Sequence, residues 1–498
     1  MNPSAPGFLG IDVGTSAVKG VVLSTDGTVV ASAAVPHATH ITRPEWAEQR
    51  PEDWWDGVLS VLAKLGSVVR LDGVRGIGVS SQAPTLLAVD ASGRPVRDAL
   101  IWMDRRAEPQ CQRFAASGRE QEFLELTGNP LDASLVLPKL LWMKENEQPR
   151  FRRTAHFLQA NGYVVLRLTG ALSLDESHAS LLGLRTPGAT GWSEVALAEA
   201  GISASQLPPV SRSDTVVGGV TERVAALTGL QPGTPVVAGT VDSAAAALDA
   251  GASADDMAVE VTGSSGVLVM PTACPVSHPA FLSMAAAERG WLALAPTVAS
   301  GAALQWFSSV AGASGLDDVL AAAAKADPGA NGVLFVPYLM GERAPVWDTG
   351  ARGAFVGLSL LNDHADLARA VLEGAALALR HNLTVAASLG LAPRRLRSTG
   401  GPTASDLWCQ VKADVTGLPV ERLTGSGGAA RGAGIVAVAG TGNGALAALS
   451  SSGVEVTYFR PNPSHAVAYD EVFARYLEAS RAVLSLGHGA RGPLCARR

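Results

Sequence analysis

A glycine turn near the N-terminus carries the residue types that hold a phosphate group. A short apolar run, which predicts a buried strand, leads into a turn formed by Asp12, Gly14, Thr15 and Ser16, with Lys19 beyond. Glycine lets a phosphate approach the backbone, successive N–H groups can surround it, and a hydroxyl adds a donor. An acid just before the turn suits a metal ion that bridges phosphates. An ordinary hairpin turn with a capping aspartate is the alternative, because short glycine motifs are common.

The same pattern occurs a second time about halfway along the chain. Two apolar runs, Ala258 to Thr262 and Val267 to Met270, flank the turn Gly263-Ser264-Ser265-Gly266. Two hairpins of one kind predict a duplicated architecture. We therefore expect the two turns to clamp a polyphosphate from both sides. A duplicated hairpin without a ligand is the alternative.

Two other positions join a strand to a helix and carry polar groups. Thr399-Gly400-Gly401-Pro402 precedes a predicted helix that carries Ser405, and it suits a nucleotide base or ribose, or marks a simple helix start. Asp242 lies where a predicted strand enters the alanine-rich helix Val241 to Ala250. Considered locally, an aspartate in that place is a helix N-cap.

The elements that must position these residues form an α/β chain of two halves. A length of 498 residues is too great for one core, and no low-complexity linker divides the chain. We expect one domain over 1–249 and another over 250–498, with a cleft between them. Hydrophobic periodicity and Asp-Gly turns predict strands over 8–13, 17–24 and 29–35 and helices over 51–64, 364–388 and 405–416.

Composition argues against several classes of partner. The net charge is −6, and the only basic tract is at the extreme C-terminus, so we expect neither nucleic acid nor an anionic membrane as a partner. The four cysteines are scattered without metal-ligand spacing, which argues against zinc and disulfides and favours a reducing cytoplasm. We expect no signal peptide and no membrane span, since no apolar run reaches the roughly 20 residues that a span needs.

Two longer motifs extend from Ser134 to Asn146 and from Gly353 to Glu373. Through these motifs the chain resembles the FGGY carbohydrate kinases, and within them most of all the xylulokinase branch. The C-terminal motif fits the family pattern throughout, and the N-terminal motif fits except at Val136. Positions that match the family extend from residue 8 to about residue 476. The resemblance implies the two-domain actin-like ATPase fold, which is ribonuclease H-like and shared with hexokinase, Hsp70 and actin. It also implies cytoplasmic phosphorylation of a small sugar by ATP and Mg²⁺.

The resemblance also implies roles for single residues. Asp242 matches the general base that takes a proton from the sugar hydroxyl, and Asp12 and Asp242 match positions that organise Mg²⁺. The positions that match ATP-binding residues are Asp12, Gly14, Thr15, Ser16, Lys19, Gly263, Ser264, Gly301, Gln305, Gly400, Gly401 and Ser405. A non-kinase ATPase that switches like actin or Hsp70 is the alternative from another class.

The predicted sugar site departs from its relatives after the strand that ends near Ser80. Glycerol kinases carry Arg-Glu after the glutamine that matches Gln82, and most xylulokinases carry Met-His, but here Ala83 and Pro84 follow. Loss of the Arg-Glu pair makes glycerol the least favoured substrate. A smaller, more apolar wall suits a longer or less hydroxylated sugar. We expect D-xylulose as the substrate, with ribulose, erythritol or a deoxy-ketose as alternatives.

A tryptophan and an aspartate complete the predicted sugar site. Trp102 and Asp104 match the family's Trp-x-Asp-x-Arg segment. We expect Trp102 to pack against the carbon face of the sugar and Asp104 to bind its hydroxyls, unless Asp104 only pairs with Arg105. We also expect a homodimer.

Overall fold

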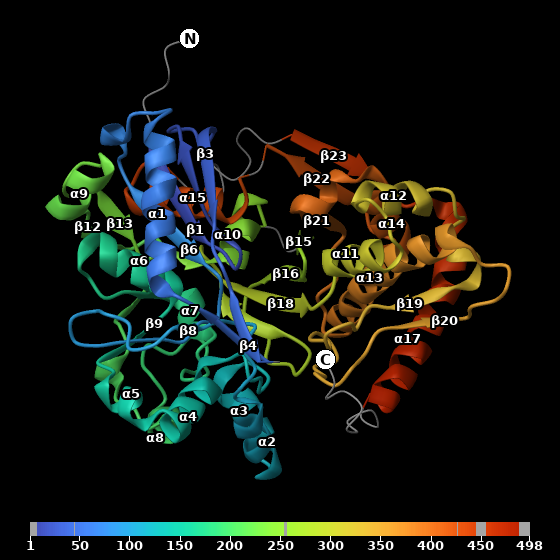
Figure 1. Cartoon of the computed structure of the whole chain (residues 1–498), viewed down its shortest axis with the longest axis horizontal. Coiled ribbons are helices and arrows are strands. Elements are labelled where there is room, and N and C mark those ends of the chain that lie inside the picture. The colour runs from blue at the N-terminus through green and yellow to red at the C-terminus, as the bar shows by residue number, and fades with distance from the viewer. Residues whose placement is uncertain (1–6, 44, 253–255, 426, 445–454, 488–498) are drawn as a thin grey trace. The chain divides into compact units, whose positions relative to one another are not determined.

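The computed structural model describes residues 7–43, 45–252, 256–425, 427–444 and 455–487 (Figure 1). The chain divides into two compact units. The first contains Met1–Ser253, Pro271–Ala293 and Gly425–Val454, and the second contains Ala254–Met270, Leu294–Thr424 and Glu455–Arg498. The division at residue 249 that we expected from the sequence does not place Pro271–Ala293 and Gly425–Val454 in the first unit. That division stays a proposal.

The first unit is built around a sheet in the order β12-β13-β6-β1-β2-β3, with β14 beside β6. β1, β2 and β3 form the expected antiparallel meander, and Gly27 turns between β2 and β3 with a φ of 85°. β6 then pairs with β1 in parallel. The strands are β1 (Phe8–Val13), β2 (Ala17–Leu23), β3 (Val29–Pro36), β6 (Ile77–Ser81), β12 (Val216–Gly219), β13 (Pro235–Val237) and β14 (Thr240–Val241).

The second sheet repeats this plan in the order β17-β18-β16-β15-β21-β22-β23. β15 and β16 form an antiparallel hairpin, β21 pairs with β15 in parallel, and β22 continues in parallel beside β21. The predicted duplication is therefore present in the strand order itself. The strands are β15 (Met257–Thr262), β16 (Gly266–Thr272), β17 (Leu282–Ala285), β18 (Trp291–Thr297), β21 (Arg395–Thr399), β22 (Val420–Thr424) and β23 (Glu455–Phe459).

Helices and short strands surround the two sheets. The first unit also contains α1 (Pro51–Gly66), α2 (Glu108–Ala116), α3 (Glu120–Thr127), α4 (Val136–Asn146), α5 (Gln148–Arg153), α6 (Ala160–Thr169), α7 (Glu176–Ser180), α8 (Glu194–Ala200), α9 (Glu222–Thr228), α10 (Asp242–Asp249), α15 (Gly428–Gly440), β4 (His40–Arg43), β5 (Trp46–Gln49), β7 (Leu87–Val89), β8 (Ala99–Leu100), β9 (His156–Leu158), β10 (Leu174–Asp175) and β11 (Val210–Ser211). The second unit also contains α11 (Gly301–Val310), α12 (Leu316–Ala323), α13 (His364–Ser388), α14 (Asp406–Thr416), α17 (Ala466–Gly487), β19 (Leu334–Val336) and β20 (Ala354–Val356).

Helix α15 lies close against the first sheet because glycines line the contact. Gly10 of β1 and Gly78 of β6 are neighbours in register. A Cβ at Gly10 would lie 1.8 Å from the carbonyl oxygen of Ala430, and one at Gly78 would lie 1.9 Å from that of Ala433. Only hydrogen atoms fit at such distances, so these glycines fix how closely the helix approaches the two strands.

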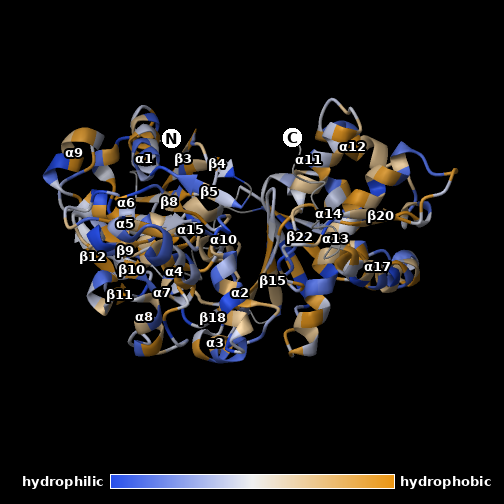
Figure 2. Ribbon diagram, turned by 60° about the horizontal axis from the view of Figure 1, so that its bottom comes forward, coloured by the Kyte–Doolittle hydropathy of each residue, from blue (hydrophilic) through white to orange (hydrophobic). Residues whose placement is uncertain are grey.

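The remaining packing gives each unit an apolar interior. In the first unit, α1 packs against β2 and β3, and Trp54 and Val58 of this helix are fully buried. In the second unit, α13 packs against β19, α12 and α14. Figure 2 shows hydrophilic and hydrophobic residues alternating along outer helices such as α17. None of the helices in the described part of the chain has the length and apolar composition that a membrane crossing requires.

We expect the substitution Gly78→Ala to destabilise the first unit by at least about 2 kcal/mol, because the added methyl group collides with the backbone of α15. Urea denaturation followed by circular dichroism measures the loss. Gly191→Ala is the control, since a Cβ there meets nothing within 4 Å. Equal stability of the two variants would contradict the glycine-lined contact.

Candidate active site

Asp12 is the penultimate residue of strand β1 and is nearly fully buried, with 4% of its surface exposed. Ser80 lies opposite it on β6 and donates a hydrogen bond from Oγ to Asp12 Oδ1 over 2.9 Å. Burial raises the pKa of Asp12 to about 6, although the charge of Lys19 and the bond from Ser80 act in the opposite direction. The carboxyl is therefore held at a strand end where its charge is costly without a cation.

Asp242 is the first residue of α10 and follows directly on β14. The N-cap position belongs to Val241, so the N-cap expected from local sequence is wrong, and the Asp242 carboxylate instead accepts a bond of 2.6 Å from the N–H of Ser243. Burial and repulsion from Asp12 raise the pKa of Asp242 to about 7, against the bond from Ser243 and the charge of Lys19.

The sheet topology explains why these two acids interact. β1 and β14 flank β6, and both run parallel to it, so their carboxyl ends lie at the same sheet edge. Two carboxyl groups with raised pKa values can accept a proton near neutral pH or share a cation. Among the described residues, no group of three or more His, Cys, Asp or Glu side chains could hold a metal ion. Two carboxylates do fit Mg²⁺, which usually takes its remaining ligands from phosphates and water.

The turn after β1 is anchored through its carbonyl groups. The carbonyl of Gly14 contacts His37 Nε2 at 3.0 Å, and the carbonyl of Thr15 accepts from Gln49 Nε2 at 2.8 Å. The carbonyl of Ser16 accepts from the N–H of His37 at 3.1 Å. In a trans peptide the next N–H points away from the carbonyl. The N–H groups of Thr15 and Ser16 therefore face away from these anchors, as a phosphate site requires.

Gln82 directly follows β6 and is fully buried. Its Nε2 donates to Gln49 Oε1 over 2.6 Å, and Trp54 Nε1 donates to the same oxygen over 2.8 Å. Gln82 Oε1 is buried and accepts no hydrogen bond from the described residues. Of the next two residues, Ala83 is partly exposed and Pro84 is buried. Gln49 was missed by sequence reasoning, and no pattern in the sequence connects it with Gln82.

Trp102 connects the predicted sugar loop with the phosphate turn, because its Nε1 donates to Thr15 Oγ1 over 2.9 Å. Asp104 is fully buried and pairs with Arg106 rather than with Arg105. Arg105 pairs with Asp132 instead.

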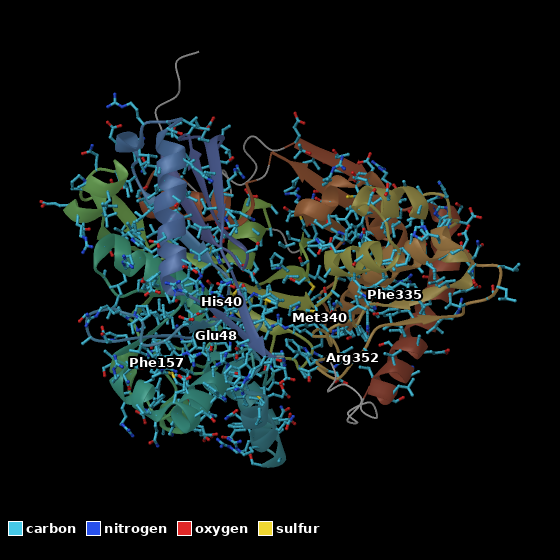
Figure 3. The ribbon with its side chains drawn as sticks, in the orientation of Figure 1. His40, Glu48, Phe157, Phe335, Met340 and Arg352 are labelled. Atoms are coloured by element: carbon cyan, nitrogen blue, oxygen red, sulfur yellow. The ribbon has the colours of Figure 1, made fainter. Side chains whose placement is uncertain are left out.

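The carboxylate of Asp104 is well supplied with donors. It accepts a hydrogen bond from the N–H of Ala47 over 2.7 Å and further bonds from Arg106. Arg106 also pairs with Glu48, which is labelled in Figure 3. This arrangement supports the loop that carries Trp102, and direct contact of Asp104 with a sugar stays a prediction.

In the second unit, three predicted nucleotide segments lie side by side. The N–H of Gly301, at the start of α11, donates to the carbonyl of Gly263 over 3.0 Å. A Cβ at Gly400 would lie 1.9 Å from the carbonyl oxygen of Thr262, and Gly400 has a φ of 108°. A Cβ at Gly301 would lie 2.4 Å from the carbonyl oxygen of Gly263, so both positions require glycine where the β15–β16 turn, α11 and the turn after β21 meet.

The other predicted nucleotide residues differ in how far they are exposed to solvent and in the hydrogen bonds that they make. The carbonyl of Ser264 accepts bonds from the N–H groups of Ser300 and Ala302. Gln305 is exposed on α11, and Gly401 is exposed in the turn after β21. Ser405 caps α14 by accepting a bond of 3.2 Å from the N–H of Trp408. The structure therefore supports its alternative role as a helix start, while contact with adenosine stays a prediction.

A buried ion pair beneath these turns was missed by sequence reasoning. Lys412 Nζ lies 2.5 Å from Glu260 Oε2 and also donates to Ser398 Oγ over 3.1 Å. Ser398 Oγ donates to the same Glu260 oxygen over 2.6 Å. Lys412, on α14, thereby joins β15 and β21 just before their glycine turns.

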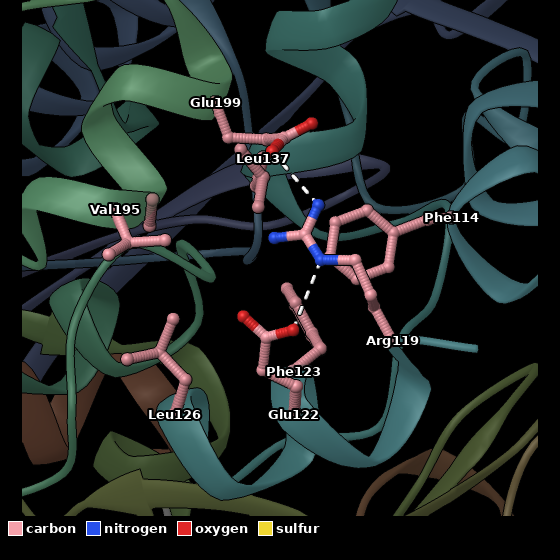
Figure 4. Close-up of a pocket in the computed structure, with 9 residues that line it drawn as sticks. Phe114, Arg119, Glu122, Phe123, Leu126, Leu137, Val195 and Glu199 are labelled. Atoms are coloured by element: carbon pink, nitrogen blue, oxygen red, sulfur yellow. Dashed lines mark hydrogen bonds and ion pairs between the residues drawn. The ribbon is translucent and has the colours of Figure 1, made fainter. Parts of the chain in front are cut away.

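The small pocket of Figure 4 lies elsewhere in the first unit, between α3, α4 and α8. Arg119 joins α3 to α8 by pairing with Glu122 and Glu199, and its guanidinium lies over the ring of Phe114. The charged residues that line the pocket are thus paired with one another. The lining residues are Phe114, Arg119, Glu122, Phe123, Leu126, Leu137, Val195, Ala196 and Glu199.

In metal-free buffer we expect Asp242→Asn to be more stable than the parent chain by about 1–3 kcal/mol at pH 8. The folded-state pKa of Asp242 is raised, so its ionised form destabilises the fold above the unfolded pKa of 3.8. The difference should therefore shrink as the pH falls through 7 toward 4. Denaturation at several pH values measures it.

Asp175→Asn is the control of opposite sign. Burial alone would raise the pKa of Asp175, but the His178 ring and several donated hydrogen bonds lower it below its usual value. Its ionised form therefore stabilises the fold above pH 4, and its loss should destabilise the chain at pH 8. Destabilisation of both variants at pH 8 would contradict the raised pKa of Asp242.

We expect Lys412→Met to destabilise the second unit by about 3 kcal/mol, because it leaves the Glu260 carboxylate buried without its cation. Chemical denaturation measures the loss. The double variant Lys412→Met with Glu260→Gln should regain most of it, since no buried charge remains. A double variant less stable than the single one would show that Glu260 does not depend on Lys412.

Comparison with known proteins identifies the family of this chain. The N-terminal domain model of the FGGY family of carbohydrate kinases matches residues 8–249, and its C-terminal domain model matches residues 258–441. Xylulose kinase of Escherichia coli strain K12 is 33% identical over 421 residues, which cover 84% of this chain and 86% of that protein. Gluconokinase of Bacillus licheniformis is 28% identical, with 82% of each chain covered.

A solved structure shows the same fold. The crystal structure of xylulose kinase from Rhodospirillum rubrum has a TM-score of 0.88 and 30% identity, and the match covers 97% of this chain and 99% of that one. The expected two-domain actin-like ATPase fold is thereby confirmed. The chain belongs to the FGGY family of carbohydrate kinases and is an ATP-dependent sugar kinase.

Proposed function

We propose that the chain transfers the γ-phosphate of MgATP to a ketopentose, with D-xylulose giving D-xylulose 5-phosphate as the preferred reaction. The observation that carries this proposal is the carboxyl of Asp242, whose pKa of about 7 suits a general base at neutral pH. It follows β14, which is paired with the strand that leads into Gln82. The relative from Escherichia coli, which is named xylulose kinase, supports the choice of sugar.

In the proposed reaction, Asp242 takes the proton from the sugar hydroxyl as that oxygen bonds to phosphorus. Base catalysis of this kind contributes roughly 10²- to 10⁴-fold, and alignment of the reactants supplies most of the rest. Gln82 Oε1 is assigned to accept a sugar hydroxyl, because a buried amide oxygen without a donor is otherwise costly. Trp102 is assigned to the carbon face of the sugar.

The nucleotide and its metal are assigned to the predicted phosphate and nucleotide segments. Asp12 and Asp242 are proposed to hold Mg²⁺, which would neutralise charge on the phosphates, and Lys19 adds a further positive charge. In the first unit the N–H groups of Thr15 and Ser16 are proposed to meet phosphate. The proposed nucleotide positions of the second unit are Gly263, Ser264, Gly301, Gln305, Gly400, Gly401 and Ser405.

A neutral sugar fits this loop better than a sugar acid does. Gluconate, which the name of one relative suggests, carries a carboxylate that calls for a cation. The cations around the Trp102 loop already have partners. Arg105 pairs with Asp132, Arg106 pairs with Asp104 and Glu48, and Lys139 donates to the carbonyl of Ile101 over 2.7 Å.

Ala83 and Pro84 leave the choice among neutral sugars to experiment. Ribulose, erythritol and a deoxy-ketose remain alternatives to D-xylulose, and glycerol is the least favoured. Release of ADP, coupled to NADH oxidation, would be measured with each of these acceptors and with gluconate. We expect the highest kcat/KM with D-xylulose. A preference for gluconate, or turnover that no sugar raises, would contradict the proposal.

Asp242→Asn tests the assigned base in the same assay. We expect kcat to fall by roughly 10²- to 10⁴-fold while the chain stays folded, because an amide cannot accept the hydroxyl proton. Asp56→Asn is the control, because Asp56 is exposed on α1. Asp249→Asn would not serve, because Asp249 pairs with the buried Arg431. Full activity of Asp242→Asn would exclude the assigned role.

We also propose that the enzyme works in the cytoplasm as a homodimer. Its nucleotide substrate supports the location, as do the free thiols of Cys111, Cys274 and Cys409. Sedimentation velocity at micromolar concentration measures the oligomeric state, and a monomer would contradict that part of the proposal.

A further inference from the structure

A buried hydrogen-bond network centred on Asp175 lies behind the predicted base and the predicted sugar strand. Asp175 ends β10 and caps α7, and its side chain is fully buried. Its Oδ2 contacts His178 Nδ1 at 2.6 Å and accepts from Asn161 Nδ2 at 2.9 Å. Its Oδ1 accepts from the hydroxyl of Ser177 and from the N–H of His178. One carboxylate thus collects four donors in the interior of the first unit.

One arm of the network reaches the end of β6. The other ring nitrogen of His178, Nε2, lies 3.0 Å from Ser81 Oγ. Ser81 Oγ also accepts from the N–H of Asn161 over 3.0 Å and lies 3.3 Å from the carbonyl of Gln82. Ser81 is the last residue of β6 and directly precedes Gln82, so this arm holds the strand end that leads into the predicted sugar site.

The other arm reaches β14. Ser177 Oγ accepts from the N–H of Val241 over 2.9 Å and lies 3.0 Å from Thr240 Oγ1. Since the Ser177 hydroxyl donates its only proton to Asp175, the Thr240 hydroxyl is the donor in that contact. Val241 directly precedes Asp242. This arm therefore holds the backbone on which the predicted base is mounted.

The network is built for position rather than for chemistry. Asp175, Ser177, His178, Ser81 and Thr240 are all fully buried. Each hydroxyl and each ring nitrogen among them has a partner within the network, which makes its arrangement specific. β6 and β14 pair in parallel, with Thr240 opposite Ser80 and Val241 opposite Ser81, so the network ties together the two strand ends that it reaches.

We propose that Asp175, Ser177 and His178 are positioning residues that fix the ends of β6 and β14 separately, the Ser81 arm setting sugar binding and the Ser177 arm setting the placement of Asp242. This inference rests on the sugar kinase function proposed above. Small displacements of a reacting group cost much of the rate, on the order of 10²-fold for 1 Å. Loss of each arm should therefore change a different kinetic constant.

The test compares Ser81→Ala with Ser177→Ala in the full-length enzyme. We expect Ser81→Ala to raise the KM for the sugar about tenfold with a smaller change in kcat. We expect Ser177→Ala to lower kcat about 10- to 100-fold with little change in the KM for the sugar. Both should leave the KM for ATP within about twofold. Ser177→Thr, which keeps the hydroxyl, should regain most of the lost kcat.

Ser180→Ala is the matched control on the same helix. Ser180 Oγ donates to the carbonyl of Glu176 over 2.8 Å and accepts from the N–H of Ala285, outside the network. We expect its kinetic constants to equal those of the parent chain. Both variants could instead reduce only the fraction of enzyme molecules that is active, which would lower the apparent kcat of each and leave every KM unchanged. In that case the network has no separate positioning arms, and the proposal is wrong.

Hydrogen exchange gives a readout that does not depend on turnover. We expect Ser177→Ala to speed exchange in a peptide over 238–246 more than in one over 77–84, and Ser81→Ala to do the reverse. If the parent chain phosphorylates no sugar but the two exchange patterns differ in this way, the proposed function fails while the two arms stand. Identical exchange patterns in the two variants would overturn the arms themselves.

Discussion

Two carboxyl groups with raised pKa values at one sheet edge are the constraint on which the rest of this structure depends. Asp12 lies near the end of β1 and Asp242 directly follows β14, and both strands flank β6. Burial raises the pKa of both carboxyl groups, and repulsion from Asp12 raises that of Asp242 further. Such an arrangement lowers stability unless a cation or a proton compensates it. The cost is consistent with the proposed roles of these groups, which are to hold a metal ion and to accept a hydroxyl proton.

The surrounding fold holds these two acids in place by close packing and by hydrogen bonds. Gly10 and Gly78 let α15 approach β1 and β6 closely, which fixes the strands that carry Asp12 and Ser80. Asp175 binds the backbone before Asp242 through Ser177. The second unit uses the same means beneath its own turns, where Lys412 and Glu260 form a buried ion pair. In the first unit, close packing and hydrogen bonds thus hold the two carboxyl groups in place. In the second unit, a buried ion pair holds the strands that lead into the glycine turns.

Local features of the fold were predictable from the sequence because local rules govern them. β1 has the expected bounds, and so does α13, where Asp363 caps the helix and Asp366 completes a capping box. The two hairpins and their glycine turns also follow from composition and spacing. Their repetition made the duplicated fold predictable, and the resemblance to a family supplied the roles that are proposed for Asp12 and Asp242.

Features that depend on distant partners could not be read from the sequence. His178 and Ser81 are 97 residues apart, and Lys412 and Glu260 are 152 residues apart, so no spacing connects them. The partner of Asp104 proved to be Arg106 because cation–π contacts with Trp46 and Trp142 hold that guanidinium in place. The cap of α10 was misjudged because Asp242 begins the helix itself.

The most direct test of this account is a crystal structure with ADP, Mg²⁺ and D-xylulose, in which the distance from the Asp242 carboxylate to the 5-hydroxyl of the sugar is measured. We expect about 3 Å, the range over which a general base takes a proton. A sugar whose 5-hydroxyl faces another acid, with Asp242 turned away from it, would contradict the central claim.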